Sequence, residues 1–309
     1  MKNLLIHPLL NNAKNNIFDI ANRIPSFGSF EQEREEVIGL DIGSSSIKLV
    51  VLEAERSKSK LLKASYKALD GQSVSSVIKK MFEESRIESN QVNVSLSGQG
   101  VVTRCIQMPR MPITEVSKAL NFEAEKYIPF PISEVTLDCC ILEELPESKI
   151  LVLFAAAKKA MIDQTLTQLK EAGLEVSLVD VDALALTNSF NRVFSSQESM
   201  KSDDLDGPVA VLNIGASFCS LNILQNGLPR FMRDIFAGGT DITKRISNIL
   251  GISFTEAEKL KSNPQEKTEQ ISSASDSIFS NLANEIRLSF DYYETQGNPA
   301  LQALYVSGG

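Results

Sequence analysis

Small hydroxyl residues follow a carboxylate in residues 41–48, which read DIGSSSIK. Asp41 precedes the turn and Lys48 follows it. Successive backbone N–H groups in a tight turn can bind an anion, and hydroxyl and ammonium groups add donors and positive charge. A carboxylate can hold Mg²⁺ directly or through its water shell. These residue types predict a site for nucleotide phosphates and Mg²⁺. The candidate ligands are Asp41, Gly43, Ser44, Ser45, Ser46 and Lys48, with Asp41 as the metal ligand.

A second stretch, residues 212–224, follows the pattern of residues 40–52 without a gap. The two share Leu, Ile, Gly, Ser, Leu and Leu at matching positions. One such turn is equally well explained as a plain β-hairpin, but two favour a duplicated fold that grips a nucleotide between its halves. The second turn adds the candidates Asn213, Gly215, Ala216 and Ser217. Asn213 replaces the carboxylate and Ser220 replaces the lysine, so the first turn carries most of the charge chemistry.

The composition excludes several classes of site. The net charge of −8 argues against nucleic acid as the main partner, because phosphate contacts need clustered Lys and Arg. His7 is the only histidine, which argues against a Ser-His-Asp triad and a histidine-bound zinc ion. The four cysteines form no C-x-x-C pair and indicate a reducing compartment. No apolar run is long enough to span a membrane, so we expect a cytoplasmic protein.

Regular elements begin after a polar leader, residues 1–36, which we expect to be either a mobile tail or a short amphipathic helix. Hairpin-like strand runs mixed with helices predict α/β domains with mixed sheets. Strands are predicted at 37–41, 47–53, 61–68, 92–96, 101–108, 135–142, 150–157, 176–181, 208–213, 218–225, 228–236 and 303–306. Helices are predicted at 74–84, from Pro112 to about residue 127, at 158–172, 183–194, 241–250, 254–261 and 271–295.

The paired turns resemble the phosphate motifs of the actin-like ATPase superfamily, whose fold is ribonuclease H-like and two-lobed. Residues 181–186 are similar to its first connecting helix, where an acidic or amide side chain orients the attacking water; the resemblance gives this role to Asp182. Residues 238–243 and 257–261 resemble segments that approach the ribose and adenine, which implicates Gly238, Gly239, Glu258 and Lys261. Residues 306–309 match the start of the adenosine motif, with Gly308 and Gly309.

Residues 121–135, together with the segment from Ala155 to Lys159, resemble the PilM family, actin-like proteins of type IV pilus assembly. The resemblance covers residues 37–309 and implies an FtsA- or PilM-type small subdomain inserted at about 106–180. It implies a first lobe at 37–200 and a second at 207–309 that is truncated at its C-terminus. It also implies an ATP- and Mg²⁺-binding scaffold with slow or negligible turnover. The implied partner is the cytoplasmic N-terminal peptide of a PilN-like protein, which would hold the chain at the inner membrane. Pilus motor ATPases, a second copy of the chain and a role in twitching motility are further expectations.

Blander interpretations stay open for three of these residues. Glu258 and Lys261 can be a solvated helix pair, and Asp182 can be the N-cap of a helix that starts at Ala183. Two other functions also stay open. One is a catalytic ATPase or phosphotransferase that uses Asp182 as its base. The other is an FtsA-like cell-division protein that polymerises and holds the membrane by an amphipathic tail.

Overall fold

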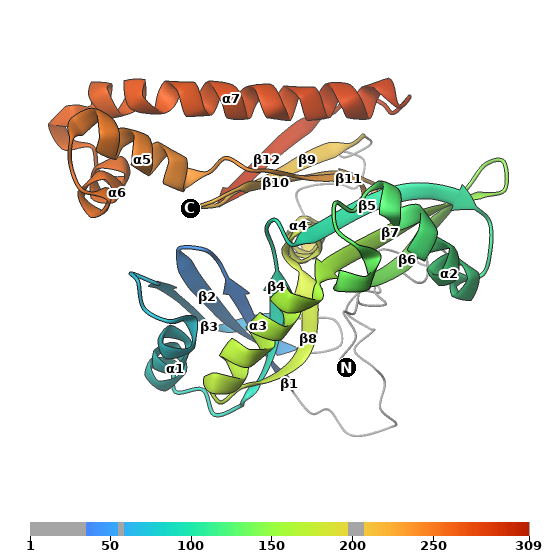
Figure 1. Ribbon diagram of the computed structural model, residues 1–309, viewed down its shortest axis with the longest axis horizontal. Helices are drawn as coiled ribbons and strands as arrows, with labels where there is room; N and C mark the ends of the chain where they lie inside the picture. The colour runs from blue at the N-terminus through green and yellow to red at the C-terminus, as the bar shows by residue number, and fades with distance from the viewer. Residues whose placement is uncertain (1–34, 55–58, 197–206, 309) are drawn as a thin grey trace. The chain divides into compact units, whose positions relative to one another are not determined.

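The computed structural model describes residues 35–54, 59–196 and 207–308 (Figure 1). The chain divides into two compact units, residues 1–197 and 198–309. Residues 1–34 of the predicted leader and Gly309 lie outside the described residues. Glu35 and Glu36 already belong to the first strand, because their backbones extend its pairing to Ala54 and Glu53.

The first unit is built on a five-stranded mixed sheet with the order β3-β2-β1-β4-β8. The first three strands are antiparallel neighbours, whereas β4 runs parallel to both β1 and β8. The carboxyl ends of β1, β4 and β8 therefore lie at one edge of the sheet. The strands are β1 (Glu35–Ile42), β2 (Ser46–Ala54), β3 (Ser59–Ala68), β4 (Gln91–Leu96) and β8 (Glu175–Val181).

Alternating apolar residues bury one face of this sheet. Ile38 and Leu40 on β1, with Ile47 and Leu49 on β2, are almost inaccessible to solvent. Helix α1 (Val74–Ser85) lies beside β2 and β3 and buries Val77, Ile78 and Met81. It begins at Ser73, whose side chain accepts a hydrogen bond from the backbone N–H of Ser76. Helix α3 (Lys159–Glu171) packs beside α1 and β8, and helix α4 (Asp182–Ser196) contacts β8 and β4.

A small antiparallel sheet with the order β5-β7-β6 is inserted in the chain between β4 and β8. Its core packs Ile106, Val152 and Phe154 against Val116 and Leu120 of helix α2. The sequence predicts an inserted subdomain at about 106–180, whereas the inserted elements span 101–158 and β8 belongs to the five-stranded sheet. The inserted elements are β5 (Val101–Pro109), α2 (Ile113–Glu123), β6 (Val135–Leu145) and β7 (Lys149–Lys158). Two short 3₁₀ turns, Ala124–Lys126 and Ile132–Glu134, connect α2 to β6.

The second unit has a four-stranded sheet with the order β11-β10-β9-β12, in which β12 runs parallel to β9. The long helix α7 runs along this sheet (Figure 1) and buries Leu282 and Tyr293 against it. Helices α5 and α6 pack on the N-terminal half of α7 around Ile246 and Ile271. The elements are β9 (Val209–Ile214), β10 (Cys219–Gln225), β11 (Leu228–Ile235), α5 (Gly239–Leu250), α6 (Phe254–Ser262), a 3₁₀ turn (Gln265–Lys267), α7 (Thr268–Thr295) and β12 (Ala303–Gly308).

Each predicted helix and strand is present in the described residues, with ends that differ by a few residues. No helix among the described residues is long and apolar enough to cross a membrane. The order of the first four strands of the five-stranded sheet matches the order of the second sheet. β3-β2-β1-β4 corresponds to β11-β10-β9-β12, with the same parallel and antiparallel pairings. The sequence repeat is therefore a repeat of structure.

Candidate functional site

The first predicted phosphate turn joins β1 to β2. Its backbone is closed by a hydrogen bond in which the N–H of Gly43 donates to the carbonyl of Ser46 at 3.0 Å. The N–H of Leu69, just after β3, donates to the carbonyl of Ser45 at 2.8 Å and braces the turn from outside. Ser44 and Ser45 are exposed, whereas Ser46 is buried. Two of the three serines of the turn are therefore exposed to solvent, and the two hydrogen bonds to the carbonyls of Ser46 and Ser45 fix the backbone of the turn.

The second predicted turn joins β9 to β10 and has the same backbone geometry. The N–H of Gly215 donates to the carbonyl of Phe218, again at 3.0 Å. Asn213 pairs across the ladder with Ser220, as Asp41 pairs with Lys48 in the first unit. The two turns therefore agree in hydrogen bond, register and strand direction, which turn chemistry alone does not require.

Both turns need glycine at the same position. A Cβ atom on Gly43 would lie 3.0 Å from the carbonyl oxygen of Ser46, and one on Gly215 would lie 2.7 Å from that of Phe218. In each case the crowded atom is the acceptor of the hydrogen bond that closes the turn. The glycine therefore keeps the turn tight and its backbone accessible.

Opposite charges meet at the base of the first turn. The ammonium of Lys48 lies 2.9 Å from a carboxylate oxygen of Asp41, and about half of each side chain is exposed. In the second turn the amide oxygen of Asn213 accepts a hydrogen bond from the hydroxyl of Ser307 on β12 at 3.3 Å. The first turn thus holds a charged pair that solvent can reach, and the second holds a neutral pair.

A row of polar residues extends from the first turn across the sheet, and two of its members, Ser95 and Asp180, were not in the site prediction. Asp41 on β1 pairs with Ser95 on β4, and Ser95 pairs with Asp180 on β8. Paired residues on neighbouring strands lie on the same face, so Lys48, Asp41, Ser95 and Asp180 form one row at the carboxyl ends of the parallel strands. Burial raises the pKa of Asp180 to about 6, although the backbone N–H of Val181 donates to its carboxylate.

Asp182 follows this row at the start of α4. Helix α4 starts at Asp182, so Asp182 is its first helical residue. The N-cap interpretation would instead place Asp182 just before the first helical residue. A carboxylate in the first helical turn is favoured by the helix dipole. Asp182 lies two residues beyond Asp180, so the first unit brings the predicted catalytic carboxylate to the edge of the sheet that carries Asp41.

The glycine pair after β11 packs directly on the second turn. The N–H of Gly239 donates to the carbonyl of Gly215 at 3.0 Å, and that of Thr240 donates to the carbonyl of Ala216 at 2.7 Å. The N–H of Gly238 donates to the side chain of Asp241 at 3.1 Å, which caps α5. The predicted residues Gly238 and Gly239 are therefore part of one structure with the second turn.

Glu258 and Lys261 on α6 form a polar cluster with α5. The ammonium of Lys261 donates to Glu258 at 2.8 Å, to the hydroxyl of Thr243 at 2.9 Å and to the carbonyl of Gly239 at 3.2 Å. Thr243 also contacts Glu258 and is itself fully buried. Partial burial opposes ionisation of Glu258, but the hydrogen bonds from Lys261 and Thr243 outweigh it and lower the pKa of this carboxylate. The pair is therefore anchored to the start of α5, unlike a simple solvated helix pair.

The predicted site residues thus form two groups. In the first unit the structure brings Asp41, the turn serines and Lys48 together with Ser95 and Asp180. In the second unit it brings Asn213, Gly215, Ala216 and Ser217 together with Gly238, Gly239, Glu258 and Lys261. Gly308, the last residue of β12, pairs with Ile214 beside the second turn. Gly309 lies outside the described residues.

The residues of the first turn fit a phosphate-bound Mg²⁺ better than a metal held by protein alone. Among the described residues, no three His, Cys, Asp or Glu side chains gather in a metal-binding group. Mg²⁺ typically takes one or two carboxylates and completes its shell with phosphate oxygens and water. Asp41 can supply the carboxylate, and the exposed serines of the turn can supply donors for phosphate, whereas the N–H of Gly43 already donates to Ser46.

Comparison with solved structures agrees with the duplicated architecture. The structure is similar to a PilM-PilN type IV pilus biogenesis complex, with a TM-score of 0.78 and 29% identity over 90% of this chain and 82% of that chain. It is also similar to the ethanolamine utilization protein EutJ from Carboxydothermus hydrogenoformans, with a TM-score of 0.53 and 15% identity over 90% of this chain and 77% of that chain. Together with the two repeated sheets and turns, this defines an α/β protein with the actin-like ATPase fold, as the sequence predicts.

The family described as type IV pilus assembly protein PilM matches residues 39–309, which is nearly all of the chain outside the leader. The chain belongs to this family.

Proposed function

We propose that the protein is an ATP-binding scaffold of type IV pilus assembly, whose nucleotide state alters how it binds a membrane partner. The observation that carries the proposal is the repeated turn. Gly43 and Gly215 close two turns with the same hydrogen bond at the ends of two equivalent sheets. A pair of such turns, one in each unit, suits the two sides of a polyphosphate.

The charge on the two turns favours holding ATP over splitting it. Asp41 and Lys48 supply a carboxylate for Mg²⁺ and an ammonium for the terminal phosphates. Asn213 can bind water of the metal shell but brings no negative charge to the second side. We therefore propose weak or negligible ATPase activity. Any turnover would use Asp182 to orient the attacking water, and steady phosphate release that is lost in Asp182→Ala would favour the catalytic alternative.

The proposed partner is the cytoplasmic N-terminal peptide of a PilN-like inner-membrane protein. Support comes from the similarity to a PilM-PilN complex over most of both chains. Binding of this peptide would place the protein at the cytoplasmic side of the inner membrane. Nucleotide binding would change the affinity of the protein for this partner.

Titration with a fluorescent ATP analogue and Mg²⁺ tests the nucleotide site. Wild-type protein should bind saturably, and Asp41→Ala or Lys48→Ala should weaken binding about ten- to hundredfold, because each removes a charge-assisted contact. Lys126→Ala is a matched control: it removes a surface ion pair, with Glu123, of nearly equal exposure, and should leave affinity unchanged. Absence of saturable binding would reject ATP binding, and an unchanged affinity in the two turn variants would mean that the phosphate site is misplaced.

A further inference from the structure

Strand β3 is the open edge of the five-stranded sheet, and only its β2 side is paired in the described structure. The N–H of Leu69, the residue after β3, donates to the carbonyl of Ser45 on the β2 side. Because N–H and C=O groups alternate in direction along an antiparallel strand, those of Ala64, Tyr66 and Ala68 point away from β2. This edge can therefore accept one more strand without loss of a hydrogen bond in the sheet.

Exposed apolar side chains lie along the same edge. Tyr66 is 64% exposed and Leu61 is 58% exposed, and Leu62 lies between them. Val50 on β2, which pairs with Ala64, is also exposed. An added strand could cover these side chains, which the described chain leaves in contact with water.

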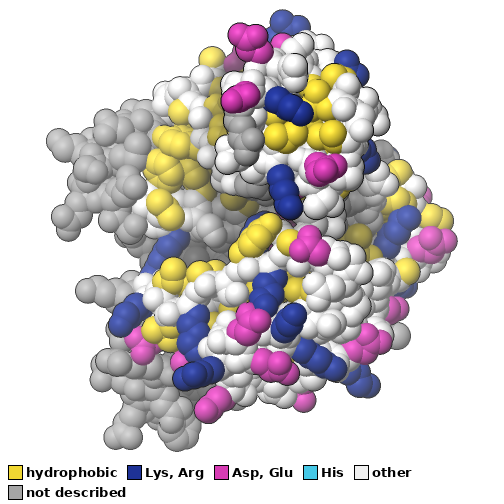
Figure 2. Space-filling model, turned by 90° about the vertical axis from the view of Figure 1, so that its left-hand side faces the viewer, with side chains coloured by type: hydrophobic (Ala, Val, Ile, Leu, Met, Phe, Trp, Pro, Cys, Tyr) yellow, Lys and Arg dark blue, Asp and Glu magenta, His cyan; other side chains and the backbone are white. Residues whose placement is uncertain are grey.

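The edge is basic although the whole protein is acidic. Strand β3 carries Lys60, Lys63 and Lys67 and no acidic residue, whereas the chain has a net charge of −8. Lys67 forms an ion pair with Glu84 of α1, and Lys63 donates to the carbonyl of Ser85 at the end of that helix. Figure 2 shows the left-hand side of the view in Figure 1, which includes α1, and Lys and Arg side chains lie there among hydrophobic and acidic ones.

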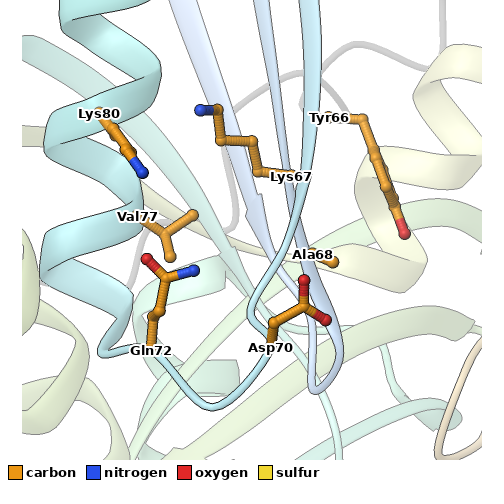
Figure 3. A pocket seen from close by; sticks show the side chains of 7 residues that line it. All are labelled: Tyr66, Lys67, Ala68, Asp70, Gln72, Val77 and Lys80. Atoms are coloured by element: carbon orange, nitrogen blue, oxygen red, sulfur yellow. The ribbon is translucent and has the colours of Figure 1, made fainter. Parts of the chain in front are cut away.

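A hollow of about 390 Å³ lies where β3 ends beside α1. Figure 3 shows Lys67 directed toward α1, Lys80 projecting from α1 toward the strand, and Tyr66 on the other side of β3. One side of the strand is thus basic and the other is aromatic. The residues that line the hollow are Tyr66, Lys67, Ala68, Asp70, Gln72, Val77 and Lys80.

We propose that β3 binds an extended segment of a partner protein in which acidic and apolar residues alternate. Such a segment would pair with the free backbone groups of Ala64, Tyr66 and Ala68. Because side chains alternate between the two faces of a strand, its acidic residues would meet Lys67 and Lys80, and its apolar residues would cover Tyr66 and Val50. A second copy of β3 fits less well, because lysine would face lysine. This surface uses none of the residues of the proposed nucleotide site, although it adjoins that site, because Tyr66 pairs with Lys48 and Ala68 pairs with Ser46.

The competing explanation is that the lysines only protect the edge from pairing, as edge lysines often do. The two explanations differ in whether an acidic strand can pair with β3. Protection predicts that no peptide pairs with β3, whereas a docking edge predicts pairing that depends on the alternating pattern and on Lys80.

Hydrogen exchange of the full chain tests this, with an eight-residue peptide of alternating Glu and Val as the probe. A peptide with the same residues in two blocks is its control. The alternating peptide should slow exchange at Ala64, Tyr66 and Ala68 at least fivefold. Lys80→Glu should abolish the effect, whereas Lys79→Glu, the same charge change on the adjacent exposed residue of α1, should preserve it.

Four results would overturn the proposal. Exchange at the edge could be unchanged by the alternating peptide, or slowed equally by the block peptide. Lys80→Glu could bind as well as Lys79→Glu. Vesicles of phosphatidylcholine and phosphatidylglycerol could slow exchange along β3 where the peptide does not, which would identify the edge as a membrane contact.

Discussion

Asp180 shows how far one buried carboxylate can influence stability. Its carboxyl group is largely enclosed, and its pKa rises to about 6 from an ordinary value of 3.8 because burial disfavours the charged form. The folded state therefore holds this proton more tightly than the unfolded state does. The contribution to stability is full below about pH 4 and is lost as pH rises through about 6.

Replacing Asp180 with Asn should remove this pH dependence. Two pKa units correspond to about 3 kcal/mol, so the variant should gain stability relative to wild type between about pH 4 and pH 7. The Asn side chain can still accept the hydrogen bond from Val181. Denaturant unfolding at several pH values measures the difference. Asp163→Asn, an exposed carboxylate on α3, should show no such trend, and equal trends in the two variants would contradict this account of Asp180.

Residue types and spacing are enough to predict the two turns, because glycine, serine and charge recur at fixed offsets. They do not indicate Asp180 or Ser95, since neither belongs to either of the two phosphate turns in sequence. Only the register of β1, β4 and β8 places them beside Asp41. The signal that could have revealed Asp180 is its spacing of two from Asp182 at the end of a strand, which places both carboxylates at the carboxyl edge of the sheet.

At the level of elements, the N-terminus of α5 stabilises the second turn through hydrogen bonds. Its first two N–H groups donate to the carbonyls of Gly215 and Ala216 instead of to solvent. The sequence predicts α5 as a helix from Asp241, but not its contact with a turn more than twenty residues earlier. That contact depends on the path that β11 gives the chain back to the second turn. The hydrophobic periodicity of the sequence does not indicate this path.

Gly238→Ala should therefore damage the second turn. A Cβ atom at this position would lie 2.5 Å from the carbonyl oxygen of Ala216 and 2.7 Å from that of Gly215. Overpacking against backbone typically costs about 1–3 kcal/mol, so thermal unfolding should occur at a lower temperature. Gly239→Ala is the control, because its nearest neighbour is the flexible end of Lys261 at 3.3 Å. Equal melting temperatures for wild type and Gly238→Ala would contradict the close packing.

At the scale of the whole molecule, we propose that nucleotide binding and partner binding are coupled. The chain belongs to the PilM family. Each unit carries a turn of the same geometry at the end of an equivalent sheet. If ATP binding changes the surface that binds the partner, the two ligands are coupled. The PilN-like partner and the nucleotide should then change each other's affinity by the same factor.

Capture by the N-terminal peptide of a PilN-like protein tests this coupling. The amount of protein retained at a fixed peptide concentration should differ with and without Mg²⁺-ATP, and the difference should disappear in Asp41→Ala. If the same amount of protein is retained with and without ATP, the peptide binds but its binding is not coupled to nucleotide.

Sedimentation with ATP and lipid separates this scaffold from an FtsA-like protein, which would form polymers that pellet with membranes.

The most direct test of the central claim is hydrogen exchange during a titration with Mg²⁺-ATP. A nucleotide held by both turns should slow exchange in residues 41–48 and 213–220 together, with one common midpoint, and Lys48→Ala should shift both responses equally. Protection of only one turn, or different midpoints for the two, would contradict a site built from both units.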